Sequence, residues 1–148
     1  MEIPDSREQV KIWQRTRPLQ PPVTEGLQAI ASAALTAAAV YGSLSQRMQG
    51  PQREMLVALR EQQIAAARCL KGIYRMATGV PLQVVGSAPA NQTMDAALRM
   101  NYGRSLKALR SYESRCTDQE YGAVFETLAM REREHCRKIA ELMGILQV

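Results

Sequence analysis

One helical stripe in the last quarter of the chain constrains the fold more than any other feature. Reading from Tyr121 in alternating steps of four and three residues traces one face of a long helix. That face is apolar everywhere except at its centre. Its members are Tyr121, Phe125, Leu128, Glu132, His135, Ile139, Leu142 and Leu146. Glu132 and His135 lie one turn apart, so this Glu-x-x-His pair is expected to face the core.

Three further segments carry the helical period, and the low aromatic content of 5% favours helix over sheet. These helices are expected to span about 24–49, 52–78 and 93–116. Thr24 and Thr93 are candidate N-caps, and Gly79 is a candidate C-cap. The sequence of 117–120, Thr-Asp-Gln-Glu, predicts a capping box that opens the fourth helix.

The segment 80–92 between the second and third helices contains two prolines and a glycine and has no helical period. When extended it reaches at most ~43–47 Å, and helices of about 26 residues are ~39 Å long. The linker can therefore cross the whole length of a bundle. The sequence predicts an all-α fold: a four-helix bundle over 23–148 with one long crossover, preceded by an N-terminal arm over 1–22.

This pattern resembles the ferritin-like superfamily, nearest to its small bacterial rubrerythrin-type members. The resemblance covers about residues 24–146. It is carried by Tyr41, by LKGIYRMATG over 70–79, and by YGRSLKALRSYESRCTDQEYGAVF over 102–125, which leads to Glu132 and His135. It implies a ferritin-like bundle with a site for two iron or manganese ions. In such a site the first and third helices each give a Glu, and the second and fourth each give a Glu-x-x-His.

The sequence departs from that pattern on three of the four helices. No Asp, Glu or His occurs from 26 to 53, so the first helix offers no carboxylate. On the second helix, Gln63 and Ala66 stand where the Glu-x-x-His is expected, and on the third Asn101 and Ser105 lie level with the pair. We therefore expect a degenerate dimetal site and no resident cofactor, with iron or manganese as the possible metals.

Two interpretations of Glu132 and His135 remain open. In the first, the pair joins a core network of hydrogen bonds in place of the metals, and the protein is a non-catalytic structural or partner-binding bundle. The partners available to that network are Gln63, Asn101, Ser105, Tyr41 and Tyr112. In the second, Glu132 and His135 hold a single metal with help from Gln63, Asn101 or Cys69, and the protein is a metal-dependent oxidoreductase. A weaker third hypothesis is redox sensing through Cys69, Cys116 or Cys136.

The charge pattern and the cysteines suggest a cellular setting. The net charge is +5, but the basic residues are scattered through every segment, so no nucleic-acid partner is expected. No apolar run near the ~18 residues of a membrane span is evident, so no membrane partner is expected either. Three cysteines without a CxxC motif, behind a polar N-terminus, indicate a cytoplasmic protein. Helices rich in small residues, together with an arm carrying Trp13, predict a homodimer and a possible contact of the arm with a protein partner.

Overall fold

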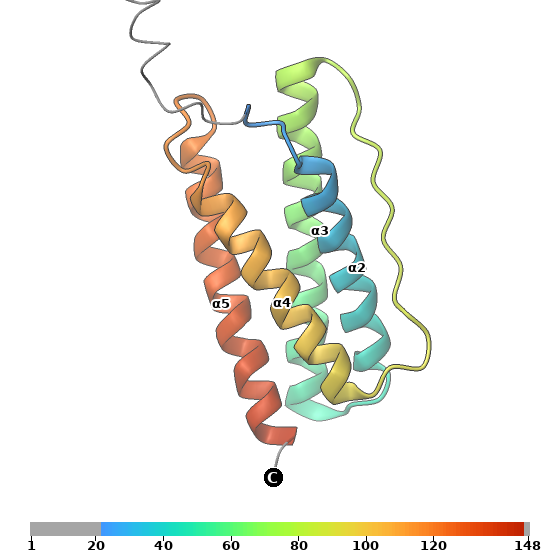
Figure 1. Ribbon diagram of the computed structural model, residues 1–148. Coiled ribbons are helices and arrows are strands. Elements are labelled where there is room, and N and C mark those ends of the chain that lie inside the picture. The colour runs from blue at the N-terminus through green and yellow to red at the C-terminus, as the bar shows by residue number, and fades with distance from the viewer. Residues whose placement is uncertain (1–21, 147–148) are drawn as a thin grey trace, which may run out of the picture.

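A computed structural model describes residues 22–146, with side chains through Gly144. This part of the chain forms four α-helices and no strand, which confirms the all-α prediction (Figure 1). The helices are α2 (Leu27–Ser45), α3 (Gly50–Thr78), α4 (Met94–Glu113) and α5 (Gly122–Leu146). Apart from Pro22, the N-terminal arm, with Trp13, lies outside the described residues.

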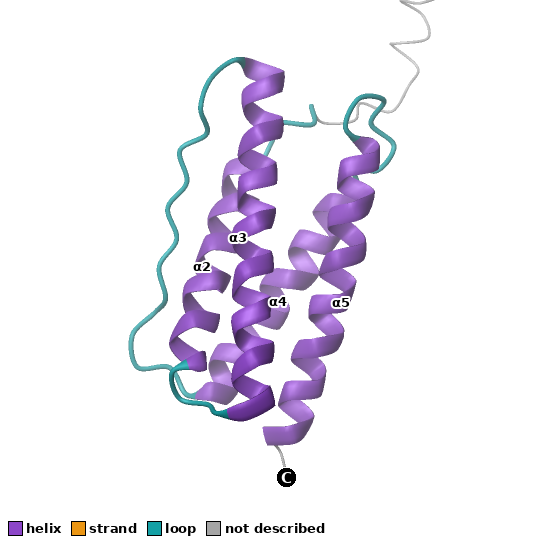
Figure 2. Cartoon of the chain, turned by 180° about the vertical axis from the view of Figure 1, so that it is seen from behind, coloured by secondary structure: helices purple, strands orange, loops and turns teal. Residues whose placement is uncertain are grey.

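The helices form two antiparallel hairpins, α2 with α3 and α4 with α5. The segment between α3 and α4 runs beside α2 from one end of the bundle to the other (Figures 1 and 2). Two hydrogen bonds fix this course: Gln28 Nε2 donates to Gln83 O at 2.9 Å, and Arg47 Nη1 donates to Gln92 O at 3.0 Å. The crossover expected from the linker length is present, and α4 consequently runs parallel to α3.

Gly86 brings the crossover into close contact with α2. A Cβ atom at this position would lie 2.5 Å from the backbone nitrogen of Thr36 and from Cβ of Leu35. Such contacts are far inside van der Waals distance, so a side chain would push the crossover away from the helix. The absence of a side chain at Gly86 is therefore what lets the crossover lie against α2.

Two helix ends follow the sequence prediction. Gly79 ends α3 in the left-handed conformation with φ 75°, which a residue without Cβ adopts without strain. Thr93 caps α4, because its Oγ1 accepts a hydrogen bond from the Ala96 backbone N–H at 3.2 Å.

Two other predicted helix starts are wrong. Thr24 is not the N-cap of α2, since the backbone turns over 22–26 and the helix begins only after Gly26, whose φ is 75°. No capping box forms before α5. Asp118 satisfies the exposed donors instead, because its Oδ2 accepts from the backbone N–H groups of Glu120 at 3.1 Å and Tyr121 at 2.8 Å. A side chain one residue further along was better placed to reach these groups.

The apolar core is divided into two clusters. One lies around Leu27, Leu70 and Phe125, and the other around Tyr41 and Ile139. The segments that separate the clusters on α3, α4 and α5 carry the buried polar residues of the bundle centre. These are Gln63, Asn101, Ser105, Glu132 and His135. We call this set the polar layer.

Among the described helices, α2 is long and apolar enough to cross a membrane when judged by length and composition. The prediction that the chain has no such run is therefore wrong, because the many alanines of α2 make a span without any charged residue. Core helices of water-soluble proteins pass the same test. One face of α2 is buried inside the bundle, including Leu27, Val40 and Leu44.

Candidate functional site

Glu132 and His135 lie in the polar layer, on the buried face of α5. Their exposed fractions are 2% and 1%, as the apolar stripe around them predicts. Nδ1 of His135 lies 3.0 Å from Oε2 of Glu132. Charged side chains are almost never this buried unless they are paired, so the neighbours of these two groups decide what the site can do.

Gln63 on α3 completes the contact from the opposite hairpin. Its Nε2 donates to Oε1 of Glu132 at 2.9 Å and lies 3.0 Å from Nδ1 of His135. The amide nitrogen, rather than the amide oxygen, must face Glu132, because two oxygens this close would repel each other without a proton or cation between them. The Gln63 amide nitrogen therefore contacts both the carboxylate and the imidazole.

Gln62 fixes the other side of the imidazole ring. Its Oε1 lies 2.5 Å from Nε2 of His135, and since a carbonyl oxygen can only accept, Nε2 carries a proton. Nδ1, on the opposite side of the ring, faces Oε2 of Glu132 at 3.0 Å. The imidazole is therefore held between Gln62 and Glu132.

The donor set does not fit a two-metal centre. Glu132 and His135 are the only Asp, Glu or His side chains of the polar layer, and Gln63 presents an amide nitrogen to them. An amide N–H group cannot act as a metal ligand and supplies no negative charge. Within residues 22–144, no group of three or more His, Cys, Asp or Glu side chains is placed to hold a metal ion. Cys69, one of the helpers considered for a single metal, thus does not join the pair in such a group.

Asn101 on α4 bonds to other partners. Its Nδ2 donates to the backbone carbonyl of Ala37 on α2 at 3.2 Å, and its Oδ1 accepts from Nη1 of Arg104 at 2.7 Å. Asn101 therefore ties α4 to α2 and holds the Arg104 side chain. The polar layer consists of two sets of bonds, one around Glu132 and one around Asn101.

Within the described residues, two buried hydroxyl groups make no hydrogen bond of good geometry, although they lie close to each other. They are the Tyr41 hydroxyl and Oγ of Ser105. Ser105 lines a cavity of about 10 Å³ together with Gln63, Arg104 and Glu132, and this is close to the smallest volume that holds one water molecule. Buried polar atoms are normally paired, so the hydrogen-bonding capacity of the bundle centre is not satisfied at these two hydroxyl groups.

The environment disfavours ionisation of two tyrosines. Burial, and secondly the negative charge of Glu132, raise the pKa of Tyr41 above its ordinary value of 10.0. The pKa of Tyr112 is raised by the same two causes in the same order. Tyr112 packs against Phe125 with ring centroids 6.2 Å apart and makes no hydrogen bond to Glu132 or His135. Both tyrosines therefore remain neutral across the physiological range.

The cysteines are free and half-buried. Burial is the main cause that raises the pKa of each thiol, and Glu132 raises that of Cys136 further. Reactive cysteines need the opposite environment, one that favours the thiolate. The surroundings of Cys69, Cys116 and Cys136 therefore give no support to redox sensing.

Sequence reasoning missed Gln62 and Arg104. Neither lies on the apolar face of its helix, so the helical period gave no sign of them. The adjacent pair Gln62–Gln63 was the available signal, because a long side chain at the edge of a buried face can still reach inward.

No protein-family model matches the chain. A comparison with curated proteins finds no match either. The resemblance to ferritin-like proteins therefore stays a prediction from the sequence motifs.

Proposed function

We propose that this protein is a ferritin-like bundle in which hydrogen bonds have replaced the dimetal site, and that it acts as a non-catalytic structural or partner-binding protein. The observation that carries the proposal is the position of Gln63. Its amide nitrogen lies within 3.0 Å of both Oε1 of Glu132 and Nδ1 of His135. An amide N–H that donates to the buried Glu132 carboxylate satisfies it where a cation would do so in a metalloprotein.

The helix arrangement supports the ferritin-like part of the proposal. Two antiparallel hairpins are joined by a crossover along α2, so α3 and α4 run in the same direction. This connection distinguishes ferritin-like bundles from the simple up-down-up-down arrangement. The Glu-x-x-His of α5 points into the core at mid-bundle, where that family binds its metals.

The shortage of carboxylates in the polar layer argues against catalysis at two metals. Oxygen or peroxide chemistry at two metals needs several anionic ligands and open coordination positions. The buried polar layer contains one carboxylate, Glu132, and it is already paired on both oxygens. As its cellular role we propose a cytoplasmic homodimer that binds a protein partner.

Metal analysis of the full-length protein tests the proposal. We expect protein from cells supplied with iron and manganese to contain far less than one metal per chain, and its melting temperature to stay unchanged in added Mn²⁺ or Fe²⁺. Saturation of a specific site would raise that temperature. The alternative, a single-metal oxidoreductase on Glu132 and His135, predicts near-stoichiometric metal.

Two variants make this result specific. Under the alternative, Glu132→Gln removes the bound metal, while Glu134→Gln, an exposed carboxylate on the same helix, leaves it in place. Stoichiometric metal that is lost only in Glu132→Gln would overturn the proposal. Metal lost equally in both variants would indicate surface binding and leave the proposal standing.

A further inference from the structure

A groove lies between α2 and α4. Its volume is about 390 Å³, within the ~300–1,000 Å³ typical of small-molecule sites. The α2 wall is apolar, with Ala29, Ile30 and Ala33 at helical spacing, and the α4 wall carries Arg104, Lys107 and Ala108. The small side chains leave the space open, and the two cations give it a positive edge.

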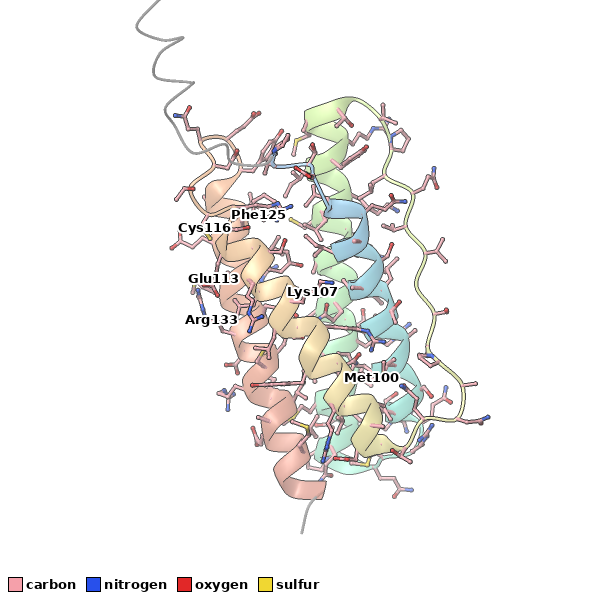
Figure 3. All side chains as sticks on the ribbon, viewed as in Figure 1. Met100, Lys107, Glu113, Cys116, Phe125 and Arg133 are labelled. Carbon is pink, nitrogen blue, oxygen red and sulfur yellow. The ribbon has the colours of Figure 1, made fainter. Side chains whose placement is uncertain are left out.

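The charge in the groove is not compensated within the described part of the chain. None of the described lining residues is acidic, and no described carboxylate pairs with Arg104 or Lys107. Arg104 uses Nη1 for Asn101 and keeps further N–H donors. Lys107 projects from α4 on the side of α2 (Figure 3). Because the two residues are three positions apart on one helix, both can reach the same anionic group.

Arg115, also in the groove wall, serves a different purpose. Its guanidinium donates to Ser111 and to the backbone carbonyls of Val23 and Glu25, and it lies over the ring of Phe125. These bonds hold the chain before α2 against the end of α4. Arg115 therefore shapes one end of the groove and is already engaged.

A buried hydroxyl group lies next to the groove, in the small cavity of the polar layer. The groove and the small cavity of the polar layer share Ala33, Arg104 and Ala108 in their walls. Ser105 lines that cavity, is 1% exposed, and its Oγ has no partner. An unpaired buried hydroxyl is unfavourable, so a water molecule in that cavity would be stabilised by Ser105.

We propose that this groove binds an amphipathic monoanion of the medium-chain carboxylate type. The hydrocarbon chain lies over Ala29, Ile30 and Ala33, and the carboxylate lies between Arg104 and Lys107, where a guanidinium can hold both oxygens. A second copy of this chain fits less well, because a twofold contact through this face would set the same cations against each other. The inference does not depend on the proposed loss of the metal site.

Titration of the full-length protein with decanoate tests the site, followed by NMR of ¹³C-labelled alanine methyl groups. We expect the methyl signals of Ala29, Ala33 and Ala108 to shift and saturate. Octanoate, two methylene groups shorter, should bind about tenfold more weakly. Uncharged 1-decanol should also bind more weakly than decanoate. Equal affinity for decanol and decanoate, or shifts confined to other alanines, would overturn the proposal.

Paired variants separate charge from shape. Lys107→Gln should weaken decanoate binding about fivefold, whereas Lys71→Gln, an exposed lysine on α3, should leave it unchanged. Ala29→Leu fills the groove from an exposed position and should abolish binding, whereas Ala140→Leu on α5 should not. If the two variants of either pair changed decanoate affinity equally, the proposed site would be wrong.

Sedimentation of the same variants tests the competing occupant. The proposal expects Ala29→Leu to leave the oligomeric state unchanged. If instead Ala29→Leu turns a dimer into a monomer and decanoate shifts no alanine signal of the wild type, the groove is a contact between copies of the chain. The ligand proposal is then wrong.

Discussion

The side-chain nitrogen of Gln63 lies 2.9 Å from Oε1 of Glu132, although 69 positions of the chain separate the two residues. Gln63 belongs to the α2–α3 hairpin and Glu132 to the α4–α5 hairpin. The same nitrogen lies 3.0 Å from Nδ1 of His135. One amide group therefore joins the two halves of the bundle at the level where the apolar core is interrupted.

Glu132 and His135 are expected to depend on each other for stability. Glu132→Leu or His135→Leu alone leaves a buried polar partner unpaired, which should lower the free energy of unfolding by about 3–5 kcal/mol. The double variant should lose less than the sum, with a coupling of about 1–3 kcal/mol. Denaturant unfolding of the four proteins measures this coupling.

The exposed pair Glu134–Arg137 is the matched control, because it has the same three-residue spacing on the same helix. Leucine substitutions there should show almost no coupling, since water and salt screen exposed charges. Equal coupling in the buried and exposed pairs would show that burial of Glu132 and His135 adds nothing to their interaction.

Metal binding should be recoverable on α3. Gln63→Glu with Ala66→His introduces a second Glu-x-x-His at the level of Glu132 and His135, and so supplies four ligands in place of two. We expect this variant to bind Co²⁺ at least tenfold more tightly than the wild type. Visible absorption of the bound Co²⁺ and a Co²⁺-dependent rise in melting temperature measure the effect.

The same motif on the exposed side of α3 provides the control. Ala65→Glu with Arg68→His introduces a Glu-x-x-His of the same spacing, but both positions are exposed. This variant should bind Co²⁺ no better than the wild type. Tight binding by both variants would mean that the metal is held at the surface and not in the polar layer.

Removing the hydroxyl of Tyr41 should stabilise the protein. The group is buried and makes no hydrogen bond of good geometry, although Asn101 and Ser105 lie near it. The cost of its desolvation is therefore poorly compensated in the folded state. We expect Tyr41→Phe to raise the free energy of unfolding by about 1 kcal/mol at pH 7, as measured by denaturant titration. A loss of stability would show that the hydroxyl has a partner, such as a water molecule.

Alkaline pH should destabilise the fold through Tyr41 and Tyr112. Both have pKa values raised above 10.0 in the folded state, whereas an unfolded tyrosine ionises near pH 10. Their contribution to the free energy of unfolding is complete below pH 10 and is lost as the pH rises above 10. Above pH 10 the folded chain binds more protons than the unfolded chain, so deprotonation favours unfolding. The free energy of unfolding should fall by about 1.4 kcal/mol per pH unit for each tyrosine.

Substitution by phenylalanine resolves the contribution of each tyrosine. Tyr41→Phe should remove its share of this slope between pH 10 and pH 11. Tyr102→Phe, which retains both buried tyrosines, should keep the full slope. An unchanged slope in Tyr41→Phe would mean that Tyr41 ionises in the folded state as it does in the unfolded state.

Two glycine substitutions should change stability in opposite directions. Gly86→Ala places a methyl group 2.5 Å from the backbone of α2 and should lower the free energy of unfolding by about 1–3 kcal/mol. Gly72→Ala lies inside α3 with nothing within 4 Å and should raise it by about 0.5–1 kcal/mol. Thermal unfolding measures both effects, and a neutral Gly86→Ala would show that the crossover does not depend on its contact with α2.

Much of the polar layer was predictable from the sequence, because the periodicity of a helix determines which side chains lie on the same face. The spacing around Glu132 and His135 placed both in the core, and the same reasoning placed Gln63 in the middle of the buried face of α3. It could not show that Gln62, at the edge of that face, would reach the imidazole. The period also gave no sign that Asn101 would bond to Ala37 and Arg104, because such contacts depend on how far one helix is shifted along another.

The amino-acid sequence by itself determined four helices, a linker long enough to cross the bundle, and one buried Glu-x-x-His, because period, caps and chain length act over short distances. Only the tertiary structure decided that the Gln63 nitrogen contacts both Glu132 and His135, and that a cationic groove opens between α2 and α4. These features depend on the axial register and separation of helices that are far apart in the chain. The packing of all the side chains together sets that register, and no local pattern encodes it.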